Sequence, residues 1–500
     1  MHNIEYAITP ISGAKEAILL SLKNYFLKGM ADDFIDYQIT EDIEKYLFPF
    51  KENLYCLIEN PYVDKVYRDS FYNYYSSKHY TYHRDCIRVS IFSSKISAKD
   101  FFVENGHKSL RKKYLGFFII RPLSTALLGR SVINPKAYTV NRFNICSYTV
   151  ESLVIGVKLS TEGFPHSSQD GETISCAETT IWTLMEYFGN KYSEYKPALP
   201  KAIINAIAKF SYQRYLPSNG LTMHQISYVL HEFGFGTRFY SDDENGIKDL
   251  YNIIDSYVES GIPIIAGLEV TNECLGHVMV VMGKKRQNRK QINWTRIKKD
   301  QFTARGRTVC YYDATNIPAK YVIQDDNLEP YRVVKLSKPG EHYSDDDRKK
   351  YHIDGVIVPL YPKMYLEAVV AKELILELIK YNIIGYDFKD EFVFRFFLTS
   401  SRSLKNHIAS INEMDILLKY NIVSSKMPKF VWCGEFYTTD GYANGQAIGL
   451  VIVDATEANQ RSQDALIFAG YPDRCIRKNE NNFVTLPEGF SGYIYYDNLN

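Results

Sequence analysis

Two hydrophobic patterns, each repeated along the chain, constrain its fold more than any other feature. Residues 222–233 and 365–381 carry apolar side chains at helical spacing, and a helix is also expected from Ala14 to Met30. Residues 87–92 and 114–123 are instead rich in β-branched and aromatic side chains, which predicts strands. Because both kinds of segment alternate along the sequence, we expect a mixed α+β fold.

The chain is long enough for several domains. Its 500 residues correspond to about two to four domains of ordinary size. We place divisions near positions 155 and 361, which gives an N-terminal α+β accessory domain (1–155), a central domain (156–360) and a C-terminal α+β accessory domain (361–500). The C-terminal region follows its predicted helix with strand-like runs such as FVFRFFLTSS, FVWCGEFYTT and AIGLVIVDAT.

Charge and composition limit the classes of partner. The chain has 59 Lys and Arg against 58 Asp and Glu, so no overall positive field draws in nucleic acid. The basic stretch 284–300, KKRQNRKQINWTRIKKD, is the only candidate for such a contact. We interpret it as a solvated loop, inserted after a strand, that can be shortened without loss of the central fold.

Targeting signals and metal motifs are not visible in the sequence. No run approaches the roughly 18 apolar residues that span a bilayer, and the first residues do not resemble a secretory signal. The eight cysteines are scattered without a CxxC pair. This pattern favours reduced thiols in the cytoplasm over a disulfide framework, and we expect no membrane partner, metal or organic cofactor.

The segment SSQDGETISCAETTIWTLMEYFGNK (167–191) carries the strongest chemical signal. Apolar residues at 181, 184, 185 and 188 have helical spacing, and Ser175 with Glu178 forms an S-x-x-E capping box. This predicts that Cys176 is the first residue of a helix. The positive end of the helix dipole favours the thiolate, which is the nucleophilic form of cysteine.

A cysteine nucleophile needs a general base, and His277 is the best candidate. The apolar runs IPIIAGL and HVMVVMG bracket a polar turn and predict a hairpin, and His277 opens its second strand after Gly276. A histidine at the mouth of a strand can face a cleft. His166, in the loop before Cys176, and His224 and His231, on a predicted helix, are weaker candidates.

The third member of such a site accepts a hydrogen bond from the histidine. Asp325 follows the apolar strand Tyr321–Gln324, and we place it ahead of its neighbours Asp326 and Asn327 and of Asp313. Strand alternation puts Asp325 and Asp326 on opposite sides, but the sequence does not say which side faces the histidine.

The order of these elements resembles the papain-like cysteine peptidases, within them the branch that processes bacteriocin leader peptides. The resemblance covers roughly residues 160–360 and implies a papain-like central domain with a helix-borne cysteine packed on an antiparallel sheet. It implies Cys176 as nucleophile, His277 as base, Asp325 as the orienting carboxylate and Gln169 as the oxyanion donor. Gln169 precedes Cys176 by seven residues, one more than is usual in this family, and Ala177 replaces the usual glycine.

The resemblance implies acyl transfer through a thioester. The Cys176 thiolate attacks an amide carbonyl, His277 protonates the leaving amine, and water then resolves the thioester. We therefore expect a cytoplasmic cysteine peptidase acting on a peptide or protein substrate. Two alternatives stay open: an acyl or amide transferase using the same triad, as in transglutaminase-like enzymes, or a papain-like binding module without turnover.

Overall fold

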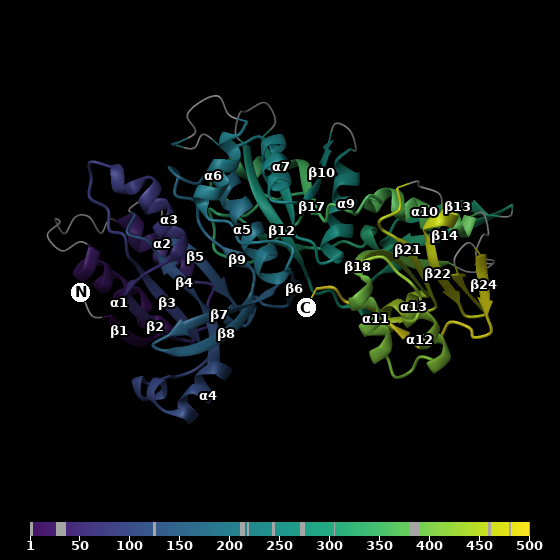
Figure 1. The fold of residues 1–500 in the computed structure, drawn as a ribbon, viewed down its shortest axis with the longest axis horizontal. Coiled ribbons are helices and arrows are strands. Elements are labelled where there is room, and N and C mark those ends of the chain that lie inside the picture. Colours follow the sequence, from purple (N-terminus) through teal and green to yellow (C-terminus); the bar gives the residue numbers. More distant parts are fainter. Residues whose placement is uncertain are drawn as a thin grey trace. The chain divides into compact units, whose positions relative to one another are not determined.

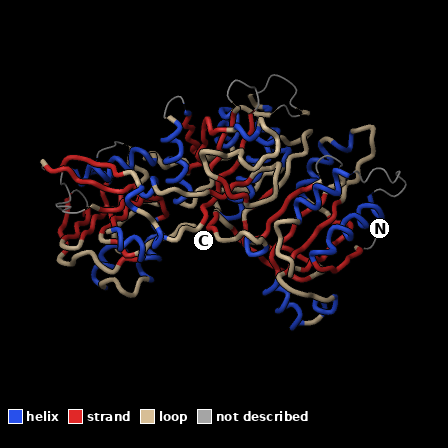
Figure 2. Tube along the Cα trace, turned by 180° about the vertical axis from the view of Figure 1, so that it is seen from behind, coloured by secondary structure: helices blue, strands red, loops and turns tan. Residues whose placement is uncertain are grey.

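The computed structural model divides into two compact units, each built from separate stretches of chain (Figure 1). Unit 1 contains Met1–Gly234, Ile265–Met282 and Val322–Ile353, and unit 2 contains Phe235–Ile264, Gly283–Tyr321 and Asp354–Asn500. The structure describes residues 4–26, 37–123, 127–210, 216–217, 220–242, 246–270, 276–304, 306–380, 391–458, 462–479 and 482–499. Strands and helices are interspersed along the trace (Figure 2), and the antiparallel sheets confirm the predicted α+β class.

Unit 1 begins with a six-stranded antiparallel sheet. Its order is β1 (Glu5–Pro10), β2 (Tyr55–Tyr62), β3 (Cys86–Phe92), β4 (Tyr114–Ile120), β5 (Leu128–Ile133) and β9 (Pro165–His166). Every residue of β3 and β4 is buried, which confirms the two strands predicted here and explains their nearly continuous apolar character. The helices of this region are α1 (Ala14–Ser21), α2 (Tyr37–Leu47), α3 (Lys65–Asn73) and α4 (Glu104–Lys113). The predicted helix Ala14–Met30 is present as α1 and the π-helical segment Leu22–Phe26 that follows it, and residues 27–30 lie outside the described residues.

The rest of unit 1 carries the residues singled out for chemistry. Its helices are α5 (Cys176–Lys191), α6 (Pro200–Ala208) and α7 (Met223–Glu232), and its strands are β6 (Phe143–Ile145), β11 (Ile264–Glu269), β12 (Gly276–Lys285), β15 (Tyr321–Gln324) and β16 (Arg332–Val334). Strands β11, β12, β15 and β16 are hydrogen-bonded in that order, and β6 pairs with β12. All residues of α5 from Ala177 to Phe188 are buried, so α5 is a core helix and the elements around it fix its position.

Unit 2 is organised around an eight-stranded sheet. Its order is β13 (Lys299–Ala304), β14 (Arg307–Asp313), β18 (Phe392–Ser400), β19 (Phe430–Tyr437), β21 (Gly449–Asp454), β22 (Leu466–Tyr471), β23 (Arg474–Asn479) and β24 (Asn482–Leu486). Strand β10 (Gly236–Ser241) pairs antiparallel with β17 (His352–Leu360), and β20 (Gln446–Ala447) and β25 (Tyr493–Ile494) form a two-stranded sheet. The helices are α9 (Ile247–Glu259), α10 (Ala368–Lys380), α11 (Ser401–Ser410), α12 (Ile416–Val423), α13 (Thr439–Asn444) and α14 (Ser462–Ala465).

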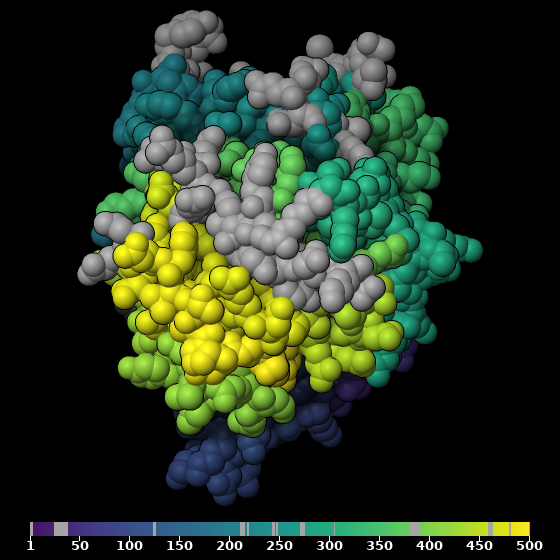
Figure 3. All heavy atoms as spheres, turned by 90° about the vertical axis from the view of Figure 1, so that its right-hand side faces the viewer, coloured from purple at the N-terminus to yellow at the C-terminus, as the bar shows by residue number. Residues whose placement is uncertain are grey.

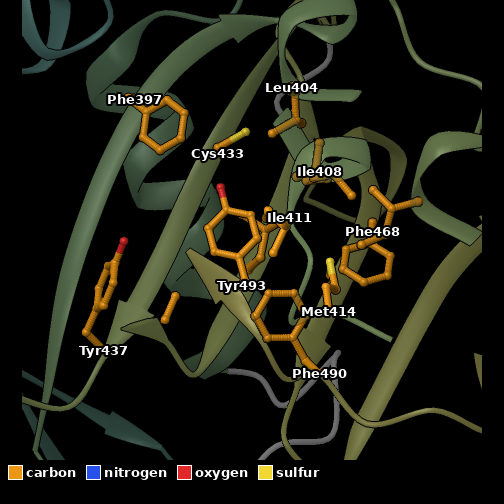
Figure 4. Packing of buried hydrophobic residues seen from close by; sticks show 14 of the residues in the cluster. Phe397, Leu404, Ile408, Ile411, Met414, Cys433, Tyr437, Phe468, Phe490 and Tyr493 are labelled. Carbon is orange, nitrogen blue, oxygen red and sulfur yellow. The ribbon is translucent and has the colours of Figure 1, made fainter. Parts of the chain in front are cut away.

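The core of unit 2 lies between this sheet and helices α11 and α12. Figure 4 shows Phe397, Leu404, Ile408 and Cys433 among the apolar side chains that meet there, and all four are fully buried. The C-terminal segment contributes Tyr493 to the same cluster. The three C-terminal strands predicted from sequence, now β18, β19 and β21, all contribute to this core.

Buried tyrosine hydroxyls satisfy buried charges in unit 2. Arg395, which is 1% exposed, donates to Glu435 at 2.6 Å and to Glu259 at 2.8 Å. Tyr493 donates to Glu435 at 2.8 Å, and Tyr495 donates to Glu259 at 2.7 Å. Each carboxylate thus has both a cation and a hydroxyl partner, which offsets the desolvation of the buried charges.

The basic stretch 284–300 corrects one expectation. Most of its charged side chains are exposed, but Ile297 is a buried member of the core of unit 2, and Ile292 and Trp294 pack against that core. The stretch leads into β13, one edge strand of the eight-stranded sheet, whose opposite edge strand β24 belongs to the C-terminal segment coloured yellow in Figure 3. The interpretation as a dispensable solvated loop is therefore wrong for its apolar residues, which anchor it.

The observed units differ from the three-part division expected from sequence. Position 155 lies in the turn between β7 (Tyr148–Val154) and β8 (Val157–Gly163), a hairpin that belongs wholly to unit 1. Position 361 lies within unit 2. The chain enters unit 2 three times, and a pattern that is local in sequence contains no signal for such returns.

None of the helices formed by the described residues is long and apolar enough to cross a membrane.

Candidate active site

The N-terminus of α5 places Cys176 at the first helical position. Ser175 is the N-cap residue, and its backbone N–H donates to a carboxylate oxygen of Glu178 at 2.9 Å. Glu178 is fully buried, so the capping box predicted from sequence is present and internal. Cys176 itself is half-buried, which leaves its sulfur within reach of a reactant.

The loop before Cys176 is held by one carboxylate and one guanidinium. Asp170 accepts from the backbone N–H groups of residues 172–174 at 2.6 to 3.0 Å. Arg121 donates to the backbone carbonyl of Gln169 at 3.2 Å. These bonds fix the backbone on the way into α5 and hence the place from which the Cys176 side chain leaves the chain.

His277 and Asp325 form a buried hydrogen-bonded pair. The distance from His277 Nε2 to Asp325 Oδ1 is 3.0 Å, and the two residues are 7% and 1% exposed. The backbone N–H of Asn327 donates to the same oxygen at 3.0 Å, and the Tyr343 hydroxyl donates to Asp325 Oδ2 at 2.5 Å. Both carboxylate oxygens therefore have partners, which fixes the carboxylate and through it the imidazole ring.

His277 also contacts Cys176. The Cys176 side chain helps to raise the pKa of the imidazole. The Tyr351 ring stacks on the imidazole with centroids 6.1 Å apart and planes inclined by 24°. The structure thus brings Cys176, His277 and Asp325 together.

The charges of this group favour an imidazolium. Burial lowers the pKa of His277, but the attraction and hydrogen bond of Asp325 and the contact with Cys176 outweigh it and hold that pKa well above its usual range. Burial likewise raises the pKa of Asp325, while the charge of His277 and the hydrogen bonds from His277, His342 and Tyr343 hold it far below its usual range.

Gln169 lies beside the same group through Asn327. Its amide nitrogen donates to Asn327 Oδ1 at 2.8 Å, and the Asn327 amide lies 3.4 Å from His277 Nε2. One amide hydrogen of Gln169 is thus engaged and the second is left for another acceptor. The backbone N–H of Cys176, at the first turn of α5, has no acceptor within the helix, as is general for helix N-termini.

The alternatives for the third member fall in two places. Asp326 Oδ1 lies 3.8 Å from His277 Nε2, and Asn327 lies in the same turn. Asp313 is part of unit 2, where it accepts from the Thr315 backbone at 3.0 Å and forms an ion pair with Lys372. The structure therefore brings Asp325, Asp326 and Asn327 to the histidine but engages Asp313 in other contacts.

Two further residues support the group and were not assigned this role from sequence. Tyr343 donates to Asp325, and His166 lies beneath the turn, with its Nε2 2.9 Å from the Leu328 carbonyl. Burial lowers the pKa of His166 to about 4, so the ring is neutral and serves as a hydrogen-bond donor. Tyr343 lies in an irregular polar segment, where no periodic signal marks it.

A cavity of about 460 Å³ adjoins this group. Its walls come from α2, the start of β5, the loop before Cys176 and the turn after β15. The lining residues are Asp42, Lys45, Tyr46, Leu127, Leu128, Ser168, Gln169, Asp170, Gly171, Asp326, Asn327, Leu328 and Glu329. Because Gln169, Asp326 and Asn327 belong both to this lining and to the surroundings of His277, the cavity provides space for a bound group next to the triad.

The same side chains include groups of the kind that bind metal ions. Among the described residues, His277, Asp325 and Asp326 are the one group of possible ligands whose atoms all lie within 4.8 Å of one another. The histidine nitrogen in that group is already hydrogen-bonded to Asp325, and a first-row metal would have to replace that bond. The arrangement fits a hydrogen-bonded pair better than a ligand set.

No protein-family model matches the chain, and no curated protein sequence matches it significantly.

Proposed function

We propose that this protein is a cysteine peptidase of papain-like type that cleaves an amide bond in a peptide or protein. The observation that carries the proposal is the position of His277 between the thiol of Cys176 and the carboxylate of Asp325. The half-buried position of Cys176 as the first residue of α5 supports it, because its thiol is accessible at the N-terminus of that helix.

The proposed reaction uses each group in turn. The Cys176 thiolate attacks the substrate carbonyl, and the oxyanion is held by the Cys176 backbone N–H and the free amide hydrogen of Gln169. His277 gives its proton to the leaving amine, which departs as the thioester forms. Water then attacks the thioester, and His277 accepts a proton from this water. The carboxylic acid is released, and the pair of Cys176 and His277 is regenerated.

Alkylation with iodoacetamide tests the nucleophile without a known substrate. The matched control is Cys310, which is also half-buried and free. Burial raises the pKa of Cys56 to about 12 and that of Cys146 to about 11, so these thiols serve as unreactive references. At pH 6 we expect Cys176 to react at least about tenfold faster than Cys310, since an ordinary thiol is almost fully protonated there.

Two outcomes would contradict the proposal. Equal rates for Cys176 and Cys310 at pH 6 would remove the activated thiolate. A His277→Ala variant that folds and keeps the fast alkylation rate at pH 6 would show that His277 does not act as the base. With a peptide library as substrate, release of a free carboxylic acid is expected, and release of a new amide instead would assign the acceptor step to an amine.

A further inference from the structure

Asp326 is the one acidic side chain beside His277 whose oxygens are left without a donor. It is 7% exposed, and neither carboxylate oxygen accepts a hydrogen bond from another residue within the described part of the chain. Its neighbour Asp325, by contrast, has donors on both oxygens. An unpaired buried carboxylate is costly, so its position next to a catalytic histidine calls for an explanation.

The charged groups around Asp326 come from three elements. His277, on β12, lies 3.8 Å away and is the cation that acts on it among the described residues. Asp325, on the same turn, and Glu178, on α5, act on it as like charges. The ionised form of Asp326 is therefore favoured by the imidazolium and by its own backbone N–H, and opposed by burial and by two carboxylates.

We propose that Asp326 is a second carboxylate partner of His277 and extends to higher pH the range in which the Cys176 thiolate and the His277 imidazolium coexist. The proposal rests on the function proposed above for Cys176 and His277. Asp325 orients the ring through a hydrogen bond, whereas Asp326 acts on the ring by charge alone, at a distance too long for a direct hydrogen bond. Asp326 is thus a positioning residue, which acts through the charge of the His277 ring.

The charge of Asp326 changes near neutral pH. Burial, the repulsion of Asp325 and that of Glu178 raise the pKa of Asp326 to about 7, against the attraction of His277. Below neutral pH Asp326 is neutral, and Asp325 alone supports the imidazolium. Above neutral pH Asp326 ionises and adds a second negative charge beside the imidazolium.

The pH dependence of Cys176 alkylation separates the two carboxylates. A thiolate–imidazolium pair gives a two-step profile: the acid step reports loss of the thiol proton, and the alkaline step reports loss of the imidazolium proton. Asp326→Asn should leave the acid step in place and move the alkaline step to lower pH by about one pH unit, the effect of a nearby charge. Asp326→Glu should restore the wild-type profile.

Asp346→Asn is the control for net charge. Asp346 also belongs to unit 1, but its side chain is 91% exposed. We expect this variant to move neither step. An alkaline step that stays in place in Asp326→Asn, or an acid step that moves by as much as the alkaline step, would overturn the proposal.

A measurement on the unmodified protein covers the case in which Asp326→Asn does not fold. With isotopically labelled histidine, the ring nitrogens of His277 should show an inflection near pH 7 from Asp326, before their own deprotonation at higher pH. A single inflection across this range would refute the role of Asp326. Slow alkylation of Cys176 at pH 6 would instead refute the proposed function, so the two failures are distinguishable.

Discussion

Replacing Asp326 by asparagine should change how the stability of the protein depends on pH, whatever the protein catalyses. The pKa of Asp326 is raised to about 7 in the folded state, against an ordinary value of 3.8. Between these two values the folded protein binds more protons than the unfolded chain, so stability falls as pH rises through this window. The loss is complete once pH exceeds the folded-state pKa.

The magnitude follows from the two pKa values. At about 1.36 kcal/mol for each pH unit between 3.8 and 7, the full loss is about 4 kcal/mol, of which about 2–3 kcal/mol falls between pH 5 and pH 7.5. The variant Asp326→Asn has no proton to lose, so this part of the pH dependence should vanish. The desolvation of the new amide affects stability equally at both pH values and therefore cancels in the comparison.

Urea unfolding at pH 5 and pH 7.5 measures the effect. The difference in free energy of unfolding between the two pH values is compared among the wild type, Asp326→Asn and the exposed control Asp346→Asn. His277 acts with the same sign: its pKa is raised, so the stability it contributes is fully present below its ordinary value of 6.5 and is lost as pH rises through its folded-state value. His277 is present in all three proteins, so Asp346→Asn shows the pH difference that includes this loss together with an intact Asp326. Identical pH differences in wild type and Asp326→Asn would refute the reasoning.

Two further substitutions test the supports of the site and of unit 2. Tyr343→Phe removes the hydroxyl that donates to Asp325 at 2.5 Å. Because a hydrogen bond to a charged group contributes about 1.5–3 kcal/mol, we expect peptide turnover to fall about tenfold while Cys176 alkylation persists. Unchanged turnover would show that Asp325 is held without it. Ile297→Asp places a carboxylate in the core of unit 2, and we expect its free energy of unfolding in urea to be at least about 3 kcal/mol lower than that of wild type. The control Lys298→Ala, at an exposed position, should stay within about 0.5 kcal/mol of wild type.

The parts of the site that depend on local patterns could be predicted from sequence. The capping box and the helical spacing after it placed Cys176 at the start of α5, and both are present in the structure. The apolar run after Gly276 placed His277 at the start of β12. Each of these assignments depends on fewer than about ten neighbouring residues, the range over which helix and strand periodicity carries information.

The environment of the aspartates could not be predicted in the same way. Alternation would place Asp325 and Asp326 on opposite sides of a strand, yet both lie near His277. The reason is that β15 ends at Gln324, and the chain then turns, with the Leu328 N–H bonding to the Asp325 carbonyl. A period of two applies only within a strand, so it gave no guide to side chains in the turn.

The division into units was likewise beyond local patterns. Strand β14 pairs in parallel with β18 about 80 residues further along the chain, with Tyr311 opposite Phe392. The sequence signals for the two strands are independent of each other, and nothing in either one identifies its partner. The prediction that the basic stretch 284–300 is a solvated loop was wrong for the same reason. Its charges are visible in the local sequence, whereas the core that holds Ile297 is assembled from segments distant in sequence.

Two adjacent aspartates with opposite ionisation behaviour are the strongest physical argument that this site is built for proton transfer. Asp325 has a donor on each oxygen and a cation at 3.0 Å, so it stays ionised at any pH the protein meets. Asp326 has the cation at 3.8 Å and no donor, so its charge changes near neutral pH. Packing needs alone give no reason to bury a second carboxylate without a partner. Titratable neighbours whose environments drive their pKa values apart are typical of acid–base sites, and here both act on the one imidazole that contacts Cys176.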